Sequence, residues 1–259
     1  LELTDIDFDM VSLFFEHLDI GDEDPVIFSC YGINPATDKK DGHFFPRKSG
    51  ERYNWDELVK WQAQHPGSRP WNKIKSELTA SHRNNLGIVS SPGGASHVGR
   101  DEIIGVRCLI YEIDDPRVSF AEQETAWIKA GLPEPSFMVN TSNRGYHVYF
   151  LLSELCGCEE GRIARTRLSK TIEAALEKDY PGIKTDHNLH SVAQVTRLPG
   201  SVHPKTHKRV TIENITGVRY SLDELDSVLL PLDQSTVLTV GAGGNFSVKP
   251  GPDSEWYEQ

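Results

Sequence analysis

The sequence predicts an α+β domain in which an antiparallel sheet carries helices on one face. Three observations lead to this class. Patterns typical of strands and helices follow one another in the order strand, helix, hairpin, helix and strands. The residues before them mix helical and extended patterns, and no internal repeat is visible. The composition, 37% hydrophobic and 25% charged over 259 residues, is that of an ordinary globular protein.

The N-terminal third combines two amphipathic segments with a longer irregular one. Apolar residues recur at three- and four-residue intervals over 8–18 and 55–65, which predicts two helices. The stretch 31–52 between them is rich in Gly, Pro, Lys and Asp, so we expect an irregular connection there. A short apolar strand follows over 86–90, and the breaker at 91–94 closes it.

The segment 103–114 is the strongest strand candidate of the chain. It is apolar on both faces until its end, which predicts a central strand covered on both sides. Ser119 and Glu122 then form a capping box that opens a helix, and Gly131 and Pro133 close that helix.

A β-hairpin and a long helix are expected next. The hairpin pairs 136–140 with 146–152 around a polar turn. The helix covers 159–178 and ends at Pro181-Gly182. The remaining elements are strands over 192–198 and 210–213, a second capping box at Ser221 and Glu224 before a short helix to Leu230, and a flexible tail from Gly241 onward.

Charge is distributed unevenly along a chain whose net charge is -11. Residues 1–30 contain nine acids and no Lys or Arg, whereas residues 181–210 contain five Lys or Arg and one acid. A polyanion could therefore bind the second segment while the rest of the surface stays acidic. No apolar run approaches the ~20 residues needed to span a bilayer, so we expect no membrane partner.

The four cysteines do not form a disulfide framework, which favours a reducing, intracellular setting. Cys108 lies in an apolar run and is expected to be a buried thiol. The chain starts with Leu1 rather than Met, so we expect an excised fragment of a longer protein.

Carboxylates at the end of the strand 103–114 are the first candidate site. Side chains two residues apart in a strand point to the same face, so Glu112 and Asp114 project together. Their repulsion and loss of hydration would be relieved by a divalent cation, and oxygen ligands suit Mg²⁺ or Mn²⁺. A two-metal site for phosphoryl transfer needs a third carboxylate, and Asp186 in the basic segment is the candidate. Asp115 points the other way and is expected to serve the turn.

The hairpin turn and the basic segment offer groups that could bind phosphates. The turn at 142–147 carries a hydroxyl, a guanidinium and an imidazole, and Arg144 could bind a triphosphate through charge-assisted hydrogen bonds. Gly145 is expected to supply a backbone conformation that other residues resist. Arg197 and Lys205 flank a rigid turn that could hold a phosphate tail or a template backbone.

Taken together, these segments resemble the archaeo-eukaryotic primase superfamily, and most closely the primase-polymerases of phages, plasmids and other mobile elements. That family has a strand ending in acid-x-acid, matched at 111–114, and a Ser-rich turn leading to a His, matched at 142–147. Its third motif is an Asp followed by Arg-x-Pro-Gly-Ser and Lys, matched by Asp186 and 197–205. The residues at 91–94 look like the family's Pro-Gly turn before the first motif.

The resemblance covers about 86–209 and implies an RRM-like antiparallel sheet packed beside an N-terminal α/β module. We therefore expect a catalytic domain over 1–232, with modules at 1–100 and 101–220, and a linker at 233–259. The resemblance also implies template-directed addition of dNTPs or NTPs on single-stranded or primed DNA, with two Mg²⁺ or Mn²⁺ ions. It further implies a fused or separate helicase, and a cytoplasmic location in a bacterial, archaeal or phage-infected cell.

By the same resemblance, metal ligands and nucleotide contacts are assigned to individual residues. The metal ligands are Glu112, Asp114 and Asp186, and the nucleotide contacts are Ser142, Asn143, Arg144 and His147, with Arg197 and Lys205 nearby. Glu112 departs from the family, which more commonly has Asp at this position. The longer side chain can still reach a metal, but it can alter metal preference, and an inactive member of the family stays a possibility.

Three alternatives remain open at this point. The first is a non-catalytic replication-initiator domain on the same fold, which would not need metal-dependent nucleotide binding. The second is a zinc-stabilised domain, in which Cys156 and Cys158 join His203 and His207, or His187 and His190. The third is a nuclease with similar carboxylates, which would have no reason to keep the turn at 142–147.

Overall fold

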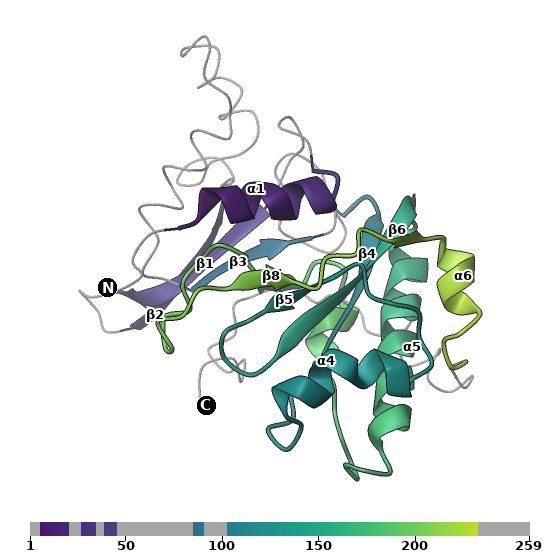
Figure 1. Cartoon of the computed structure of the whole chain (residues 1–259). Coiled ribbons are helices and arrows are strands. Elements are labelled where there is room, and N and C mark those ends of the chain that lie inside the picture. Colours follow the sequence, from purple (N-terminus) through teal and green to yellow (C-terminus); the bar gives the residue numbers. More distant parts are fainter. Residues whose placement is uncertain (1–5, 21–26, 35–38, 46–84, 91–102, 233–259) are drawn as a thin grey trace.

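The computed structural model describes residues 6–20, 27–34, 39–45, 85–90 and 103–232 (Figure 1). In these ranges the chain forms two β-sheets, with helix α1 (Phe8–His17) lying against both and helices α4, α5 and α6 beside the second. The predicted helix at 55–65, the breaker at 91–94 and the expected tail lie outside the described residues. No helix in the described ranges is long and apolar enough to cross a membrane.

The first sheet has the strand order β2-β1-β3-β7 and is antiparallel. Its strands are β1 (Ile27–Asn34), β2 (Lys39–Phe45), β3 (Asn85–Val89) and β7 (Val195–Arg197). The expected irregular connection over 31–52 is therefore wrong for the part that forms β1 and β2. Local composition disfavoured strands there, but pairing with β3 supplies the backbone hydrogen bonds, and strand formation depends more on such context than on propensity.

The second sheet has the order β4-β6-β5-β8, with β9 paired in parallel to β6. Its strands are β4 (Val106–Glu112), β5 (Phe137–Asn140), β6 (Tyr146–Cys156), β8 (Thr211–Glu213) and β9 (Arg219–Tyr220). The predicted hairpin corresponds to β5 and β6. The predicted central position of β4 is wrong, because within the described chain β4 pairs along its length with β6 alone. It is apolar on both faces because both faces of the sheet are covered.

Three helices and a short 3-10 turn follow β4 within the described residues. Both predicted capping boxes are present, with Ser119 opening α4 (Phe120–Lys129) and Ser221 opening α6 (Leu222–Asp226). The long helix is α5 (Cys158–Leu176), and the 3-10 turn is η2 (His187–His190). Helix α6 ends at Asp226, four residues before the predicted end at Leu230.

Two hydrophobic cores lie on opposite faces of the second sheet. Cys108 and Ile110 of β4 face the core shared with α1 and the first sheet, and Cys108 is the buried thiol that we expected. Leu109 and Tyr111 face the core formed with α4, α5 and α6. Because side chains alternate along a strand, Glu112 of β4 belongs to the side that faces the first sheet. The face between the two sheets is where the predicted site residues collect.

Candidate active site

Glu112 and His147 form the buried floor of the site. They are cross-strand partners of β4 and β6, and Nε2 of His147 lies 3.1 Å from Oε2 of Glu112. His147 shares its strand face with Tyr149, as predicted, but the residue is fully buried. Its second nitrogen, Nδ1, is buried and has no hydrogen-bond partner among the described residues.

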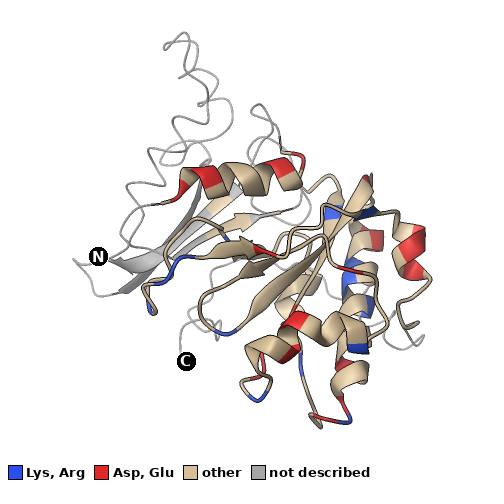
Figure 2. Cartoon of the chain, viewed as in Figure 1, with Lys and Arg blue, Asp and Glu red and all other residues tan. Residues whose placement is uncertain are grey.

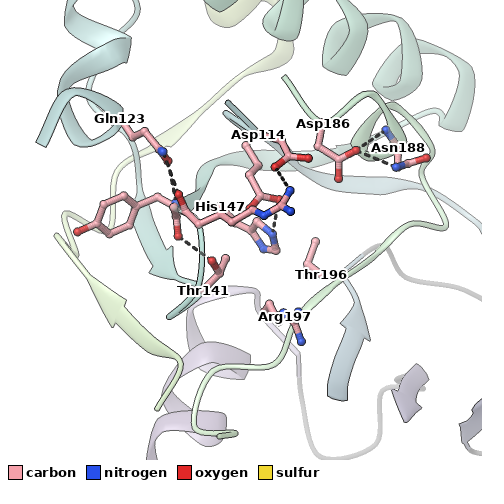
Figure 3. A network of polar contacts seen from close by, with 12 residues as sticks. Asp114, Gln123, Thr141, His147, Asp186, Asn188, Thr196 and Arg197 are labelled. Carbon is pink, nitrogen blue, oxygen red and sulfur yellow. Dashed lines mark hydrogen bonds and ion pairs between the residues drawn. The ribbon is translucent and has the colours of Figure 1, made fainter. Parts of the chain in front are cut away.

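Asp186 is brought next to Glu112 by backbone pairing. The amide N of Asp186 donates to the carbonyl O of Glu112 over 2.8 Å, and Thr185 forms an antiparallel bridge with Ile113. The Asp186 side chain caps η2, where Oδ1 accepts from the backbone N and from Nδ2 of Asn188, each at 2.9 Å (Figure 3). Burial, and then the negative charge of Glu112, raise the pKa of Asp186 to about 6.

Asp114 is held by an ion pair with the hairpin turn. Nη1 of Arg144 lies 2.7 Å from Oδ1 of Asp114, and both side chains are partly exposed (Figure 3). Asp115 instead accepts from the backbone N of Arg117 at 3.0 Å and pairs with its guanidinium, which lowers the pKa of Asp115. Asp115 therefore belongs to the turn, as predicted, and Asp114 is the acid that forms an ion pair with the hairpin turn.

Asp186 lies beside Glu112, and Asp114 follows Glu112 by two residues, but the three side chains are not gathered around one point. In the described chain, no three His, Cys, Asp or Glu side chains are gathered closely enough to hold a metal ion. The chemistry nevertheless fits a divalent cation, because the donors are oxygens, and a cation would oppose the burial and the Glu112 charge that raise the pKa of Asp186. Coordination by Asp114 would require its ion pair with Arg144 to open. The same absence of a gathered set gives the zinc alternative no support, since its candidate residues are all described.

Ser142 ties the hairpin turn to the basic loop. Its Oγ donates to the carbonyl O of Arg209, and its own carbonyl accepts from Oγ1 of Thr206 at 2.8 Å. The residue adopts a positive φ of 62°, which the side chain of Asn140 supports by accepting from the Ser142 amide at 2.9 Å. The hydroxyl predicted to contact nucleotide is thus engaged within the protein, whereas Asn143 lies exposed at the tip of the turn.

Gln123 of α4 is a residue of the site that the sequence analysis missed. Its Nε2 donates to the carbonyl oxygens of Arg144 at 3.0 Å and Val118 at 3.2 Å, and its Oε1 accepts from the Tyr146 amide at 3.3 Å (Figure 3). A Cβ at Gly145 would lie 1.7 Å from Oε1 of Gln123. The absence of a Cβ at Gly145 thus lets the Gln123 amide lie against the turn. The predicted reason for a glycine was wrong, because its φ is not positive. The sequence signal for Gln123 was its spacing, because a residue three positions before Ala126 lies on the same face of α4, and both residues are buried.

Arg197, His203 and Lys205 lie on β7 and the loop that follows it. Nη2 of Arg197 is 3.2 Å from Nε2 of His203, while the amides of Lys205 and Thr206 point at Nδ1 from 3.2 and 3.3 Å. A neutral imidazole has one lone pair for these three donors. The tautomer that accepts from the backbone therefore presents Nε2–H beside the guanidinium, an arrangement that suits an anionic oxygen.

Burial, and then the charge of Arg197, lower the pKa of His203 to about 4, so the ring is neutral at pH 7. Figure 3 places Arg197 below His147, on the other side from Asp114 and Asp186. Lys205 is exposed on the loop. Figure 2 shows Lys and Arg on the loop before β8, whereas helix α1 carries Asp and Glu. Arg197 thus lies across the buried His147 from Asp114 and Asp186.

Comparisons with known proteins were made by sequence and by structure. The sequence profile of the Replicase family matches residues 89–229. No curated protein matches the chain. The structure is similar to the AEP domain of the cyanophage S-2L primase-polymerase (PrimPol), with a TM-score of 0.61, 22% identity, and coverage of 87% of this chain and 99% of that one.

Two further similarities are weaker. The catalytic domain of primase RepB′ in complex with initiator DNA gives a TM-score of 0.47 and 14% identity, covering 93% of this chain and 100% of that one. The polymerase domain of Mycobacterium tuberculosis Ligase D in complex with DNA gives a TM-score of 0.49 and 15% identity, covering 92% of this chain and 90% of that one. The similarity to the cyanophage domain confirms the predicted α+β primase fold.

Proposed function

Because the chain belongs to the Replicase family and has an archaeo-eukaryotic primase fold, we propose that it is a template-directed DNA primase and DNA polymerase. It would add nucleotides to the 3′-hydroxyl of a nucleic acid. One observation carries this proposal above the others. The pairing of Asp186 with Glu112 brings an acid 74 positions later in the chain to the end of β4, on the other side of His147 from Arg197 of β7.

The acidic side of the site would hold the metal ions. Glu112, Asp114 and Asp186 would supply the ligands for two Mg²⁺ or Mn²⁺ ions, which would lower the pKa of the attacking hydroxyl and neutralise charge on the phosphates. The Nε2–H of His147 donates to Oε2 of Glu112 and so fixes the orientation of that carboxylate. Arg144 pairs with Asp114 in the protein alone, and its guanidinium would be available to a phosphate if Asp114 bound a cation instead.

The basic side of the site would hold the nucleotide. Arg197 and the Nε2–H of His203 can donate to the same phosphate oxygen, because they already lie 3.2 Å apart. Lys205 would add charge from the loop, and Ser142, which is bonded to that loop through Arg209 and Thr206, and the exposed Asn143 are further proposed contacts. The proposed partners are a dNTP or NTP, a single-stranded or primed DNA template, and a helicase. The proposed domain limits stay 1–232 for the catalytic part and 233–259 for a linker.

Extension of a labelled primer tests the proposal. Single-stranded and primed templates are supplied with Mg²⁺ or Mn²⁺, giving dNTPs and NTPs separately. Asp114→Ala should abolish incorporation, whereas the matched control Asp115→Ala, which removes an acid from the turn one residue away, should retain it. Near wild-type extension by Asp114→Ala would refute the assignment.

The alternative of a non-catalytic initiator domain predicts a different pattern. Such a domain would bind DNA but would show neither incorporation nor a metal requirement for nucleotide binding. The Arg144–Asp114 ion pair is the observation that favours this alternative, because it occupies a proposed metal ligand. Binding of a labelled dNTP, measured with Mn²⁺ and with EDTA, distinguishes the two functions.

A further inference from the structure

Glu173 is a buried acid on α5 that the proposed site does not include. Its side chain is 9% exposed and accepts hydrogen bonds from four donors. Oε1 accepts from the amide of Thr185 at 3.1 Å, the hydroxyl of Thr185 at 3.0 Å and Nε2 of His187 at 2.6 Å. Oε2 pairs with Nζ of Lys170 at 2.8 Å. One carboxylate oxygen thus collects donors from the two residues that flank Asp186.

These bonds hold the Asp186 segment between two elements. On one side, β4 binds it through the Asp186 amide and the Ile113–Thr185 bridge. On the other side, α5 binds it through Glu173. Asn188 then holds Oδ1 of Asp186, while Oδ2 takes no hydrogen bond from the described residues. The direction of the free oxygen therefore depends on the backbone that Glu173 anchors.

We propose that Glu173 is a positioning residue that sets the orientation of the Asp186 carboxylate toward the metal ions. This inference rests on the proposed function, because it takes Asp186 as a metal ligand. The bonding pattern supports it, since among the described residues Glu173 bonds, apart from Lys170 on its own helix, only to Thr185 and His187. Partners that orient metal ligands typically change metal affinity by about 10- to 100-fold when they are removed.

Titration calorimetry of the whole chain with Mn²⁺ alone tests the inference. Glu173→Ala should weaken Mn²⁺ binding by about tenfold or more. Glu173→Gln keeps an acceptor for Thr185 but loses the charge, so a smaller loss of about threefold is expected. Arg167→Ala is the matched control, because Arg167 lies on the same helix but holds Asp226 and the carbonyl O of Leu229 near α6. It should leave Mn²⁺ affinity unchanged.

A second measurement separates positioning from general destabilisation. Primer extension as a function of Mn²⁺ concentration should show that Glu173→Ala needs more Mn²⁺ and recovers its rate when Mn²⁺ is saturating. A structural defect would lower the rate at every Mn²⁺ concentration. A rate that saturating Mn²⁺ does not restore would overturn the inference.

The outcomes for the two proposals are distinct. If Asp186→Asn binds Mn²⁺ like the wild type, the metal assignment in the proposed function fails. If Asp186→Asn loses affinity but a folded Glu173→Ala does not, only the role of Glu173 is refuted. Should Glu173→Ala fail to fold, wild-type Mn²⁺ affinity in Glu173→Gln overturns the inference.

Discussion

Replacing Gly145 with alanine should displace the side chain that supports the hairpin turn. The new Cβ would lie 1.7 Å from Oε1, 2.7 Å from Cδ and 2.9 Å from Nε2 of Gln123. No real Cβ contact is this short, and Gln123 is 2% exposed, so its amide must leave the position that it occupies. The carbonyl of Arg144, the carbonyl of Val118 and the amide of Tyr146 then lose their partner.

The size of the effect follows from the bonds that are lost. Each buried hydrogen bond contributes about 1 kcal/mol net, so three of them contribute about 3 kcal/mol. Alanine restricts the unfolded chain more than glycine, which offsets about 0.5 kcal/mol. We expect Gly145→Ala to lower the free energy of unfolding by about 2–3 kcal/mol. The melting temperature should fall by about 5–10 °C.

Urea denaturation of a double-mutant cycle measures the coupling directly. Gln123→Ala alone should cost about 3 kcal/mol, and adding Gly145→Ala to it should cost little more, because the obstructing amide is already absent. Gly157→Ala is the matched control, since its Cβ would meet only the flexible end of Glu160 at 3.1 Å, and it should cost no more than about 1 kcal/mol. The reasoning is refuted if Gly145→Ala is within about 0.5 kcal/mol of wild type or if the two changes are additive.

Three further predictions concern the remaining parts of the site. Arg144→Ala removes a partly exposed ion pair, so unfolding free energy should change by less than about 1 kcal/mol, while the nucleotide KM in primer extension should rise at least about tenfold. The buried His203, whose pKa is lowered to about 4, resists protonation that the unfolded chain accepts below about pH 6.5. Burial of His203 should therefore lower the free energy of unfolding by roughly 1 kcal/mol per pH unit as pH falls from 6.5 toward 4. Urea denaturation of His203→Gln should not show this pH dependence. Gly200→Ala combines a φ of 84° with a Cβ only 2.3 Å from the carbonyl O of Asp7, so unfolding free energy should fall by about 2 kcal/mol or more in thermal melts. An unchanged melting temperature would contradict this last prediction.

Local signals in the sequence determined most of the second sheet and its helices. Both capping boxes and the hairpin appear where the residue patterns placed them, because caps and turns depend on neighbours a few positions away. The alternation of side chains along a strand likewise identified the face that His147 shares with Tyr149. The family resemblance could be drawn from the order of the motifs alone, before any contact between them was known.

Contacts between distant segments were decided by the tertiary structure. The pairing of β7 with β3 and the edge position of β4 depend on strand order, which no local pattern encodes. The strands at 27–34 and 39–45 were not predicted, because β1 takes its backbone hydrogen bonds from β2 and β3, and no local pattern shows this pairing.

The support of the site also came from the tertiary structure. Gln123 beside Gly145 and Glu173 beside Thr185 are polar residues on the buried faces of helices, and their partners lie on other elements. A sequence pattern shows which residues are chemically able to act, because residue type and spacing are local properties. Which of them meet is set by the packing of the two sheets and α5 around the end of β4, since burial and hydrogen bonding between distant segments exist only in the folded chain.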